Sequence, residues 1–314
     1  MTDHKVAFVF PGQGSQKVGM LAELAENKPV VRETFAEASE VLGYDLWALI
    51  QNGPQEELNM TEKTQPALLA CSVAVWRAWC DAGGAKPDWM AGHSLGEWSA
   101  LVCADVVDFA SALKLVRLRG KYMQEAVPLG VGAMAAIIGL ADEKVEQACA
   151  QASVGGELAS PVNYNSPGQL VIAGHKAAVE SAMKLCSESG AKRAMLLPVS
   201  APFHTALMSP AAEKLAAEVE ATEFSAPAVP VVHNVNALPE SDPSAIKQLM
   251  IEQIYSPVKW VASVHYLVEQ GATATLECGP GRVLSGLIKR IDKSVETHHV
   301  EILDTLEASL SALQ

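Results

Sequence analysis

The pentapeptide Gly92-His93-Ser94-Leu95-Gly96 constrains the fold of this chain more than any other segment. It matches the pattern G-x-S-x-G and lies between an expected short strand, Pro87 to Ala91, and an expected helix that begins at Leu95. Glycines at both ends allow a sharp turn from strand to helix, which projects the serine hydroxyl out of a sheet. The context therefore favours Ser94 as a nucleophile over a purely structural turn, with the main-chain N–H of Leu95 directed at a developing oxyanion.

Strands and helices alternate around this turn. Val6 to Phe10 is a continuous apolar, β-rich run that ends in the loop Gly12-Gln13-Gly14-Ser15-Gln16, and a largely buried helix is expected over Pro66 to Ala82. This alternation predicts a parallel α/β sheet. A chain of 314 residues has the length of one large domain, or of a large domain with an inset.

The glycine loop after the first strand does not fit a nucleotide site. A dinucleotide fingerprint requires a third glycine where Lys17 stands, and a P-loop requires Lys-Ser/Thr after Gly19, where Met20 stands. For this segment alone, a structural turn and a functional loop both stay open.

A change of rhythm between about Leu129 and Pro198 indicates a compact inserted unit. Its expected order of elements is β-α-β-β-α-β, the ferredoxin-like arrangement. We therefore assign residues 1–128 and 199–314 to a large α/β-hydrolase-like catalytic domain and residues 129–198 to the insert. The expected elements are strand Ala133 to Gly139, helix Asp142 to Ala152, strands Leu158 to Tyr164 and Gln169 to Ala173, helix Lys176 to Ser189, and strand Ala191 to Leu197.

The chain after the insert continues the α/β pattern. We expect a helix over Pro210 to Ala221, a strand over Val229 to Asn234 and a helix through Ile246 to Gln253. A strand over Thr273 to Glu277 follows, then Gly279-Pro280-Gly281 and one final long helix.

Composition excludes several classes of function. With 23 Lys and Arg against 36 Asp and Glu, the formal net charge of −13 repels polyphosphate backbones, so no nucleic acid partner is expected. The six cysteines form no CxxC pair and match neither a zinc site nor a redox motif, so we expect reduced, mostly buried thiols and no metal. No apolar run is long enough for a signal peptide or a membrane span, which predicts a cytoplasmic protein without membrane contact.

A serine nucleophile needs a base, and two of the eight histidines are candidates. His204 lies in the short loop Ser200-Ala201-Pro202-Phe203-His204, which joins the insert back to the large domain, and anchored loops often carry function. His233, at the end of an expected strand, is the rival. The residues alone do not decide between the two.

Arg119 is an unexpected charge on the inner face of a helix. At about 100° per residue, Lys114, Arg117 and Lys121 lie together on an outer basic face. Arg119 falls instead at about 140° from Lys114, among apolar residues that should pack inward. A buried guanidinium requires a partner, so Arg119 either pairs with a buried Asp or Glu or binds an acidic substrate.

Together these motifs, in their order along the chain, resemble the malonyl-CoA:acyl carrier protein transacylase family, in its free-standing bacterial form. The resemblance runs nearly from end to end. It rests on Gly12-Gln13-Gly14-Ser15-Gln16, Gly92-His93-Ser94-Leu95-Gly96-Glu97, the helix that holds Arg119, Asn163-Tyr164-Asn165-Ser166-Pro167-Gly168, Phe203-His204, Gln253-Ile254-Tyr255-Ser256-Pro257 and Gly279-Pro280-Gly281.

The resemblance implies a role for each matching residue. Ser94 would be the nucleophile and His204 its base, and the main-chain N–H groups of Gln13 and Leu95 would form the oxyanion hole. Arg119 would bind the free carboxylate of a malonyl group. The histidine would be oriented by the main-chain carbonyl of Gln253 rather than by an aspartate. Further pocket residues would be Gln65, Met123, Asn163 and Phe203. Phe203, beside the base, and Leu95, after the nucleophile, resemble the residues of malonyl-selective members at these positions.

The activity that the resemblance implies is ping-pong transfer of malonyl from malonyl-CoA to the phosphopantetheine thiol of acyl carrier protein, which would supply fatty acid synthesis. It implies no cofactor, no metal, a monomer, and a transient contact between the carrier and a local basic patch. Candidate patches are Lys192 with Arg193, Arg282 with Lys289 and Arg290, or Lys114, Arg117 and Lys121. Alternatives are a trans-acting polyketide acyltransferase, a serine thioesterase or esterase, and a non-catalytic binding module.

Overall fold

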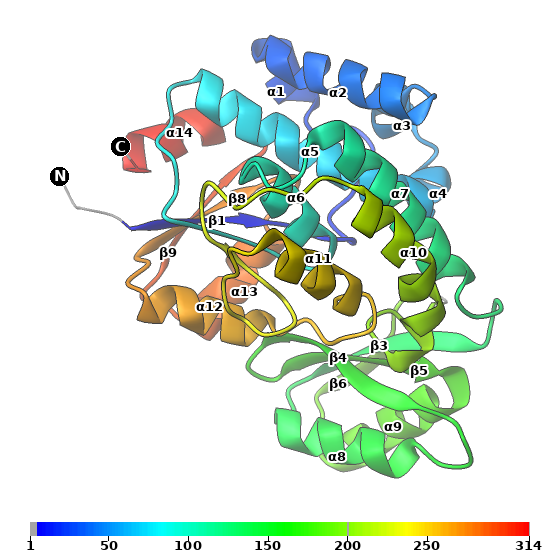
Figure 1. The fold of residues 1–314 in the computed structure, drawn as a ribbon. Coiled ribbons are helices and arrows are strands. Elements are labelled where there is room, and N and C mark those ends of the chain that lie inside the picture. Colours follow the sequence, from blue (N-terminus) through cyan, green and yellow to red (C-terminus); the bar gives the residue numbers. More distant parts are fainter. Residues whose placement is uncertain (1–4, 200, 314) are drawn as a thin grey trace.

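A computed structural model describes residues 5–199 and 201–313; Met1 to His4, Ser200 and Gln314 lie outside this range. Figure 1 shows a large lobe built around one sheet and a smaller lobe below it that contains β3 to β6. Both sheets carry helices, so the predicted α/β class is confirmed. Of the expected base loop, Ser200 is not described, whereas Ala201 to His204 are.

The sheet of the large lobe has five parallel strands in the order β7-β2-β1-β8-β9. All residues of β1 and β8 are buried, as expected for a parallel sheet that is covered on both faces. The strand bounds are Val6–Phe10 for β1, Trp89–Gly92 for β2, Val231–Val232 for β7, Ala274–Cys278 for β8 and Glu296–Val300 for β9.

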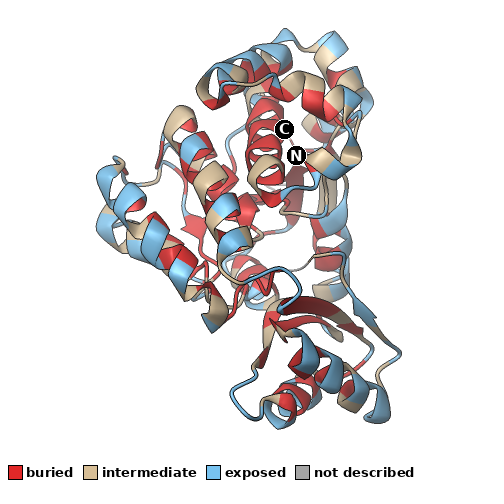
Figure 2. Ribbon diagram, turned by 90° about the vertical axis from the view of Figure 1, so that its right-hand side faces the viewer, coloured by how far each residue is buried: buried red, intermediate tan, exposed pale blue. Residues whose placement is uncertain are grey.

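Alternate residues of β1 face opposite layers of helices. Phe8 and Phe10 belong to a core with α5, α6 and α7, whereas Ala7 and Val9 pack in a second core with α12 and α13. Figure 2 shows buried residues along the sheet and on the inner sides of the helices. The helices of this lobe are α1 Ala22–Asn27, α2 Pro29–Leu42, α3 Leu46–Asn52, α4 Gln55–Leu58, α5 Thr61–Asp81, α6 Leu95–Cys103, α7 Phe109–Glu125, α10 Ser209–Ala221, α11 Pro243–Glu252, α12 Trp260–Glu269, α13 Val283–Ile291 and α14 Leu303–Leu313, with a 3-10 turn at Ala206–Met208.

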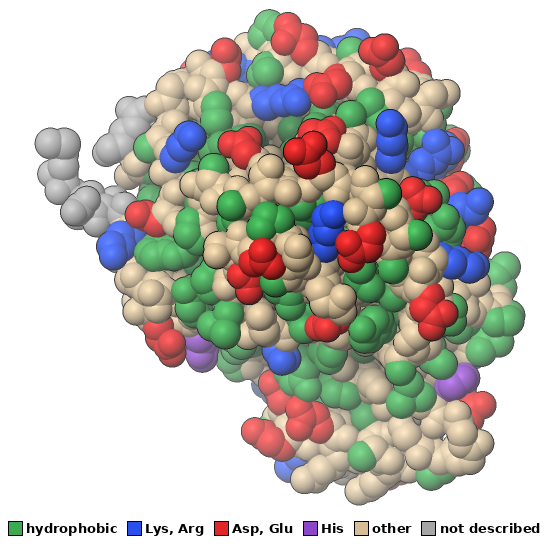
Figure 3. All heavy atoms as spheres, viewed as in Figure 1, with side chains coloured by type: hydrophobic (Ala, Val, Ile, Leu, Met, Phe, Trp, Pro, Cys, Tyr) green, Lys and Arg blue, Asp and Glu red, His purple; other side chains and the backbone are tan. Residues whose placement is uncertain are grey.

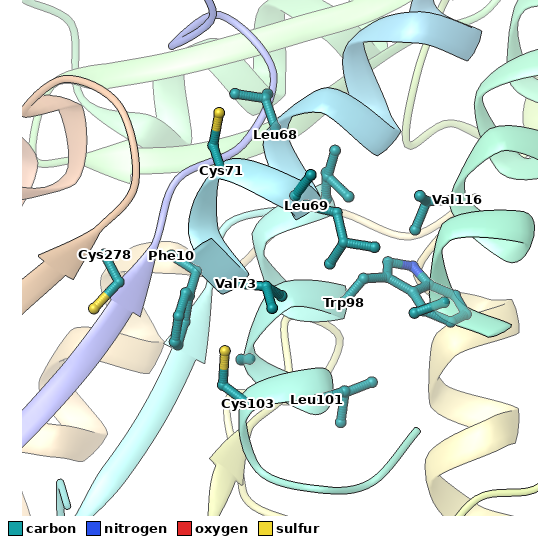
Figure 4. Packing of buried hydrophobic residues seen from close by; sticks show 14 of the residues in the cluster. Phe10, Leu68, Leu69, Cys71, Val73, Trp98, Leu101, Cys103, Val116 and Cys278 are labelled. Atoms are coloured by element: carbon teal, nitrogen blue, oxygen red, sulfur yellow. The ribbon is translucent and has the colours of Figure 1, made fainter. Parts of the chain in front are cut away.

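Three cysteines take part in the larger core. In Figure 4, Cys71, Cys103 and Cys278 lie among Phe10, Val73 and other apolar side chains. All six cysteines are free and five are buried, as predicted; Cys80 is exposed.

The small lobe is a four-stranded antiparallel sheet in the order β4-β5-β3-β6. Two helices pack against it and share its apolar core, which gives the predicted ferredoxin-like arrangement. All these elements fall within 129–198, although the domain boundaries themselves stay a prediction. The bounds are β3 Gly132–Ile138, α8 Asp142–Ala152, β4 Ala159–Ser166, β5 Gln169–His175, α9 Lys176–Glu188 and β6 Arg193–Leu196.

Main-chain hydrogen bonds join the two lobes. Tyr164 N–H of β4 donates to the carbonyl of Val258 at 3.0 Å, and Val258 N–H donates to the carbonyl of Val162 at 2.8 Å. Arg290 of α13 also donates to the Gln169 side chain of β5 at 2.6 Å. Strand β4 and the start of β5 are thus both tied to the large lobe.

The expectation of one final long helix is wrong. The segment contains α13, strand β9 and α14. Asp292 leaves the helical conformation, and its side chain accepts hydrogen bonds from the N–H and hydroxyl of Ser294, at 2.8 and 2.6 Å, which closes a turn. β9 is an edge strand with mixed polar residues, so its sequence shows no apolar run that separates it from a helix.

Two other expected elements differ in extent. The strand over Val229 to Asn234 shrinks to the two residues of β7, because His233 N–H turns away to the carbonyl of Leu238, at 3.1 Å. α5 begins a turn earlier than expected, at Thr61, and contains Pro66 near its start. The remaining expected elements are present with ends that shift by a few residues.

Candidate active site

Ser94 lies at the turn between β2 and α6 with φ 52° and ψ −108°, a backbone conformation that residues other than glycine rarely adopt. Gly92 and Gly96 make this turn possible by close approach: a Cβ on Gly92 would overlap the backbone of Gly96, and a Cβ on Gly96 would overlap the carbonyl of Phe10 in β1. The predicted nucleophile elbow is therefore present at the C-terminal end of a central strand.

Asn234 clamps this turn from the end of β7. Ser94 N–H donates to its Oδ1 at 2.7 Å, and its Nδ2 donates to the carbonyl of Gly92 at 2.6 Å. Both bonds act on the main chain on either side of the strained residue, so Asn234 holds the serine in its unusual conformation. Sequence reasoning missed this residue; the signal was its place at the end of the expected strand Val229 to Asn234.

His204 contacts the serine. Its Nε2 lies 2.8 Å from Ser94 Oγ, and its Nδ1 lies 2.8 Å from the carbonyl of Gln253. A carbonyl only accepts, so Nδ1 carries the hydrogen and Nε2 of the neutral ring is left to accept the serine proton. His233, the rival candidate, is fully buried and lies 2.7 Å from Glu97 instead.

The surroundings of His204 favour its neutral form. Burial and the Arg119 charge lower its pKa to about 3, against the smaller opposing effect of the hydrogen bond to Gln253. The ring is therefore deprotonated at Nε2 through the neutral pH range, which is the state that a general base requires.

Arg119 extends from the inner face of α7, as the helical periodicity predicts, and is 1% exposed. Its Nη1 donates to Gln65 at 2.9 Å, and its Nη2 donates to Gln253 Oε1 at 2.8 Å and to Ser94 Oγ at 3.2 Å. Burial lowers its pKa to about 10, and the negative charge of Glu97 opposes that shift. Within 5–199 and 201–313, no carboxylate forms an ion pair with Arg119, and its Nε–H has no hydrogen-bond partner. The first alternative for the guanidinium, a pair with a buried Asp or Glu, is therefore not seen in the described residues.

The two predicted oxyanion donors come from the loop after β1, which contains Gln13, and from the first residue of α6, Leu95. Neither the N–H of Gln13 nor that of Leu95 donates to another residue in the described part of the chain. The glycine loop also approaches the elbow closely, because a Cβ on Gly12 would overlap the carbonyl of His93. Two main-chain donors beside one nucleophile suit a developing oxyanion.

A cleft of about 620 Å³ contains the reacting groups. Both lobes line it, including Ser94, His204, Arg119 and Gln13. The four predicted pocket side chains line it too: Gln65, Met123, Asn163 and Phe203. Leu95 and Gln253 do not line the cleft, because both are buried. Leu95 is predicted to act through its main-chain N–H, and the main-chain carbonyl of Gln253 binds His204. The structure thus brings together all the predicted site residues, whose roles are proposed below.

Two more polar residues near the cleft were missed. His93 Nε2 lies 2.8 Å from Asn165 Oδ1, which links the elbow to β4 of the small lobe. Glu97, three residues after Ser94, is fully buried among apolar residues of α6. A lone carboxylate in such a helix was a readable signal for a buried polar partner.

The described residues contain neither a metal-binding cluster nor a membrane-spanning helix. Nowhere in residues 5–199 and 201–313 do three or more His, Cys, Asp or Glu side chains form a group that could hold a metal ion. The same residues include no helix with the length and apolar character to cross a membrane.

Comparison with known proteins agrees with this geometry. The acyl transferase domain family matches residues 7–309. The malonyl CoA-acyl carrier protein transacylase of Salmonella typhimurium is 59% identical over 303 residues, which cover 96% of this chain and 94% of the relative.

Two solved structures have the same fold. An acyl carrier protein S-malonyltransferase from Vibrio cholerae superposes with a TM-score of 0.95 at 60% identity, over 97% of this chain and 99% of its own. A malonyl-transacylase in complex with a type II PKS acyl-carrier protein superposes with a TM-score of 0.97 at 56% identity, over 98% of this chain and 99% of its own. Since the likeness extends over nearly the whole length, this chain is an acyltransferase and belongs to the family of malonyl CoA-acyl carrier protein transacylases.

Proposed function

We propose that this chain transfers the malonyl group of malonyl-CoA to the phosphopantetheine thiol of acyl carrier protein, through a malonyl ester on Ser94. The observation that carries this proposal is Arg119: a buried cation without a carboxylate partner in the described chain, 3.2 Å from the hydroxyl of Ser94. An acyl group attached to that hydroxyl would therefore lie beside the guanidinium. A free carboxylate on the acyl group compensates the buried charge, and a simple acyl chain does not.

The first half-reaction forms the ester. Ser94 Oγ attacks the thioester carbonyl while its proton moves to Nε2 of His204. The N–H groups of Gln13 and Leu95 hold the resulting oxyanion. When the tetrahedral intermediate collapses, the carbon–sulfur bond breaks and CoA leaves as the thiol with the proton from His204.

The second half-reaction repeats these steps with another thiol. The phosphopantetheine thiol of the carrier gives its proton to His204 and attacks the ester carbonyl, and Ser94 leaves with that proton. Every proton is accounted for by the serine–histidine pair, so the proposed mechanism includes neither a cofactor nor a metal ion.

For the carrier we propose the patch of Arg282, Lys289 and Arg290 among the three candidates. All three residues are exposed on or beside α13, whose Val283, Leu284 and Leu287 line the cleft. One cation of this patch and one of the patch on α7 are engaged, Arg290 with Gln169 and Arg117 with the carbonyl of Leu42, so the choice of α13 rests on its place at the cleft. On the face in Figure 3, acidic and basic side chains are interspersed, so attraction of the carrier to a basic patch must be local.

Charge reversal tests this docking surface. Lys289→Glu should raise the KM for the carrier and leave formation of the malonyl-enzyme from malonyl-CoA unchanged, because only the second half-reaction uses the patch. Lys114→Glu on α7 is the matched control and should change neither. Equal effects of both variants, or none, would contradict docking at α13.

One observation favours a second pathway, polyketide synthesis. The 56% identical malonyl-transacylase was solved in complex with a type II PKS acyl-carrier protein, so the chemistry of this cleft also suits a polyketide carrier. Rates with holo carriers of the two kinds, compared at equal concentration, distinguish the pathways. Monomeric state and cytoplasmic location stay predictions.

Steady-state kinetics test the transfer itself. Varying malonyl-CoA at several carrier concentrations should give the parallel double-reciprocal lines of a ping-pong mechanism, with CoA release that depends on holo carrier. Release of free malonate at the same rate without carrier would instead show that water is the acceptor, as in a thioesterase or esterase.

A further inference from the structure

Glu97 accepts hydrogen bonds from three parts of the active site. It is fully buried in α6, one turn after Ser94. Its Oε1 lies 2.7 Å from His233 Nδ1, and its Oε2 accepts from the N–H of Asn234 at 3.2 Å and from Gln253 Nε2 at 2.7 Å. None of the transfer steps above uses this carboxylate.

The bond to Gln253 fixes which way its side-chain amide faces. Gln253 Nε2 donates to Glu97 and, at 2.9 Å, to the carbonyl of Ser94. Its Oε1 must therefore face Arg119, where it accepts from Nη2 at 2.8 Å. If the amide were turned over, its NH₂ group would meet the guanidinium and its oxygen would meet the carboxylate, and both contacts would be repulsive.

The bond to Asn234 acts on the nucleophile. Glu97 holds the main-chain N–H of Asn234, whose side chain clamps both Gly92 and Ser94. One carboxylate thus reaches the elbow through Asn234 and reaches Arg119 through Gln253. Its negative charge also opposes the effect of burial on the pKa of Arg119.

We propose that Glu97 is a positioning residue for malonyl selection: by orienting the Gln253 amide it aims the Arg119 guanidinium at the acyl group on Ser94. This inference rests on the proposed malonyl transfer. It differs from a purely structural role, because a purely structural carboxylate would affect stability and leave the choice of acyl group unchanged.

The test compares the preference for malonyl-CoA over acetyl-CoA, as the ratio of kcat/KM for ester formation, in single and double variants. Glu97→Leu should reduce this preference about 10- to 100-fold, since the guanidinium loses its fixed direction. Glu97→Gln should recover most of it, because a carboxamide oxygen can still accept from Gln253 and Asn234. Gln253→Met keeps the carbonyl that binds His204 but removes the amide, so it should lower the preference as Glu97→Leu does.

Coupling between the two positions is the sharper result. If Glu97 acts through the amide, Glu97→Leu combined with Gln253→Met should show the same preference as Gln253→Met alone. A further fall in the double variant would overturn the proposal. Wild-type preference in Gln253→Met would overturn it as well, and that result does not require that Glu97→Leu folds.

Glu277 supplies the matched control. It is another fully buried carboxylate with three hydrogen bonds, from Leu284 N–H, Ser285 N–H and the Ser285 hydroxyl, and none of these bonds reaches Arg119. Glu277→Gln should lower Tm and leave the malonyl preference at the wild-type value. A folded Glu97→Leu with wild-type preference would overturn the proposal. If wild-type protein itself shows no malonyl preference, it is the proposed function that fails.

Discussion

Arg119 Nη2 donates a hydrogen bond of 3.2 Å to the hydroxyl oxygen of Ser94, so the buried guanidinium and the nucleophile are in direct contact. The same nitrogen is held by Gln253 Oε1 at 2.8 Å, which keeps the cation in place when the serine reacts. An acyl group therefore joins the protein beside a fixed positive charge. In the proposed function, selection of the acyl group follows from that contact, because a carboxylated acyl chain would gain a charge-assisted pair there.

Replacing Arg119 by alanine should remove this selection. Loss of a buried, hydrogen-bonded charge pair costs about 2–5 kcal/mol, so kcat/KM for malonyl-CoA should fall by about 30-fold or more. The value for acetyl-CoA should change much less, since acetyl offers no carboxylate. Initial rates of CoA release with each donor measure both.

Lys121→Ala is the control for that variant, because Lys121 lies on the same helix and is exposed to solvent. It should leave both rates unchanged. An unchanged preference for malonyl in Arg119→Ala would exclude the guanidinium as the carboxylate site.

The pH dependence should report the neutral state of His204. Its pKa is lowered to about 3, so the base stays deprotonated as pH falls, and the acid limb of kcat/KM should lie well below the ordinary histidine value of about 6.5. Arg119→Gln removes one of the causes of this shift, so the pKa of His204 should rise and the limb should move to higher pH. Acetyl-CoA is the suitable donor, because it has no acyl carboxylate that titrates. Superimposable limbs in the two proteins would contradict the electrostatic account.

Gly96→Ala should damage the elbow. Its Cβ would overlap the carbonyl of Phe10, so strand and helix must separate, and the free energy of unfolding should fall by about 1–3 kcal/mol or more. Gly286→Ala in α13 is the control: a Cβ there has nothing within 4 Å, and alanine should stabilise that helix by up to about 1 kcal/mol. Urea unfolding of the three proteins gives the comparison; similar shifts in both variants would show that the close approach is not required.

Phe203→Ala should widen the range of acyl groups. The Phe203 ring lines the cleft beside His204 and is 8% exposed, so its removal leaves room for a branch on the α-carbon. The kcat/KM for methylmalonyl-CoA relative to malonyl-CoA should rise about tenfold, the usual effect of one methyl group in a pocket. Phe224→Ala is the control, because Phe224 has the same exposure but packs against Trp98 outside the cleft. Equal ratios in both variants would mean that Phe203 does not limit the acyl group.

The sequence predicted those parts of the fold that have a local signature. The run Val6 to Phe10 and the glycines around Ser94 predicted β1 and the elbow, because apolar continuity and close backbone approach leave few alternatives. β9 was missed because it is a partly polar edge strand, whose pairing partner β8 lies on the other side of α13 in the sequence. Helical periodicity placed Arg119 on an inner face but could not say what it meets there.

The polar network of the site was beyond local reasoning. Asn234 is 140 positions from the serine that it clamps, and Gln253 is 134 positions from Arg119. The first pairing exists only after the parallel sheet brings the ends of β2 and β7 together, and the second only after α7 and the C-terminal end of α11 come together. His204 was one of two open candidates for the same reason: the residues alone did not show that its ring would reach Ser94 and that of His233 would not.

The most direct test of the central claim is the intact mass of the protein after brief mixing with malonyl-CoA alone. Wild-type protein should gain one malonyl group, peptide mapping should place it on Ser94, and added holo carrier protein should remove it and gain the same mass. Ser94→Ala should gain nothing. A malonyl group on another residue, or rapid appearance of free malonate without any adduct, would contradict transfer through a malonyl ester of Ser94.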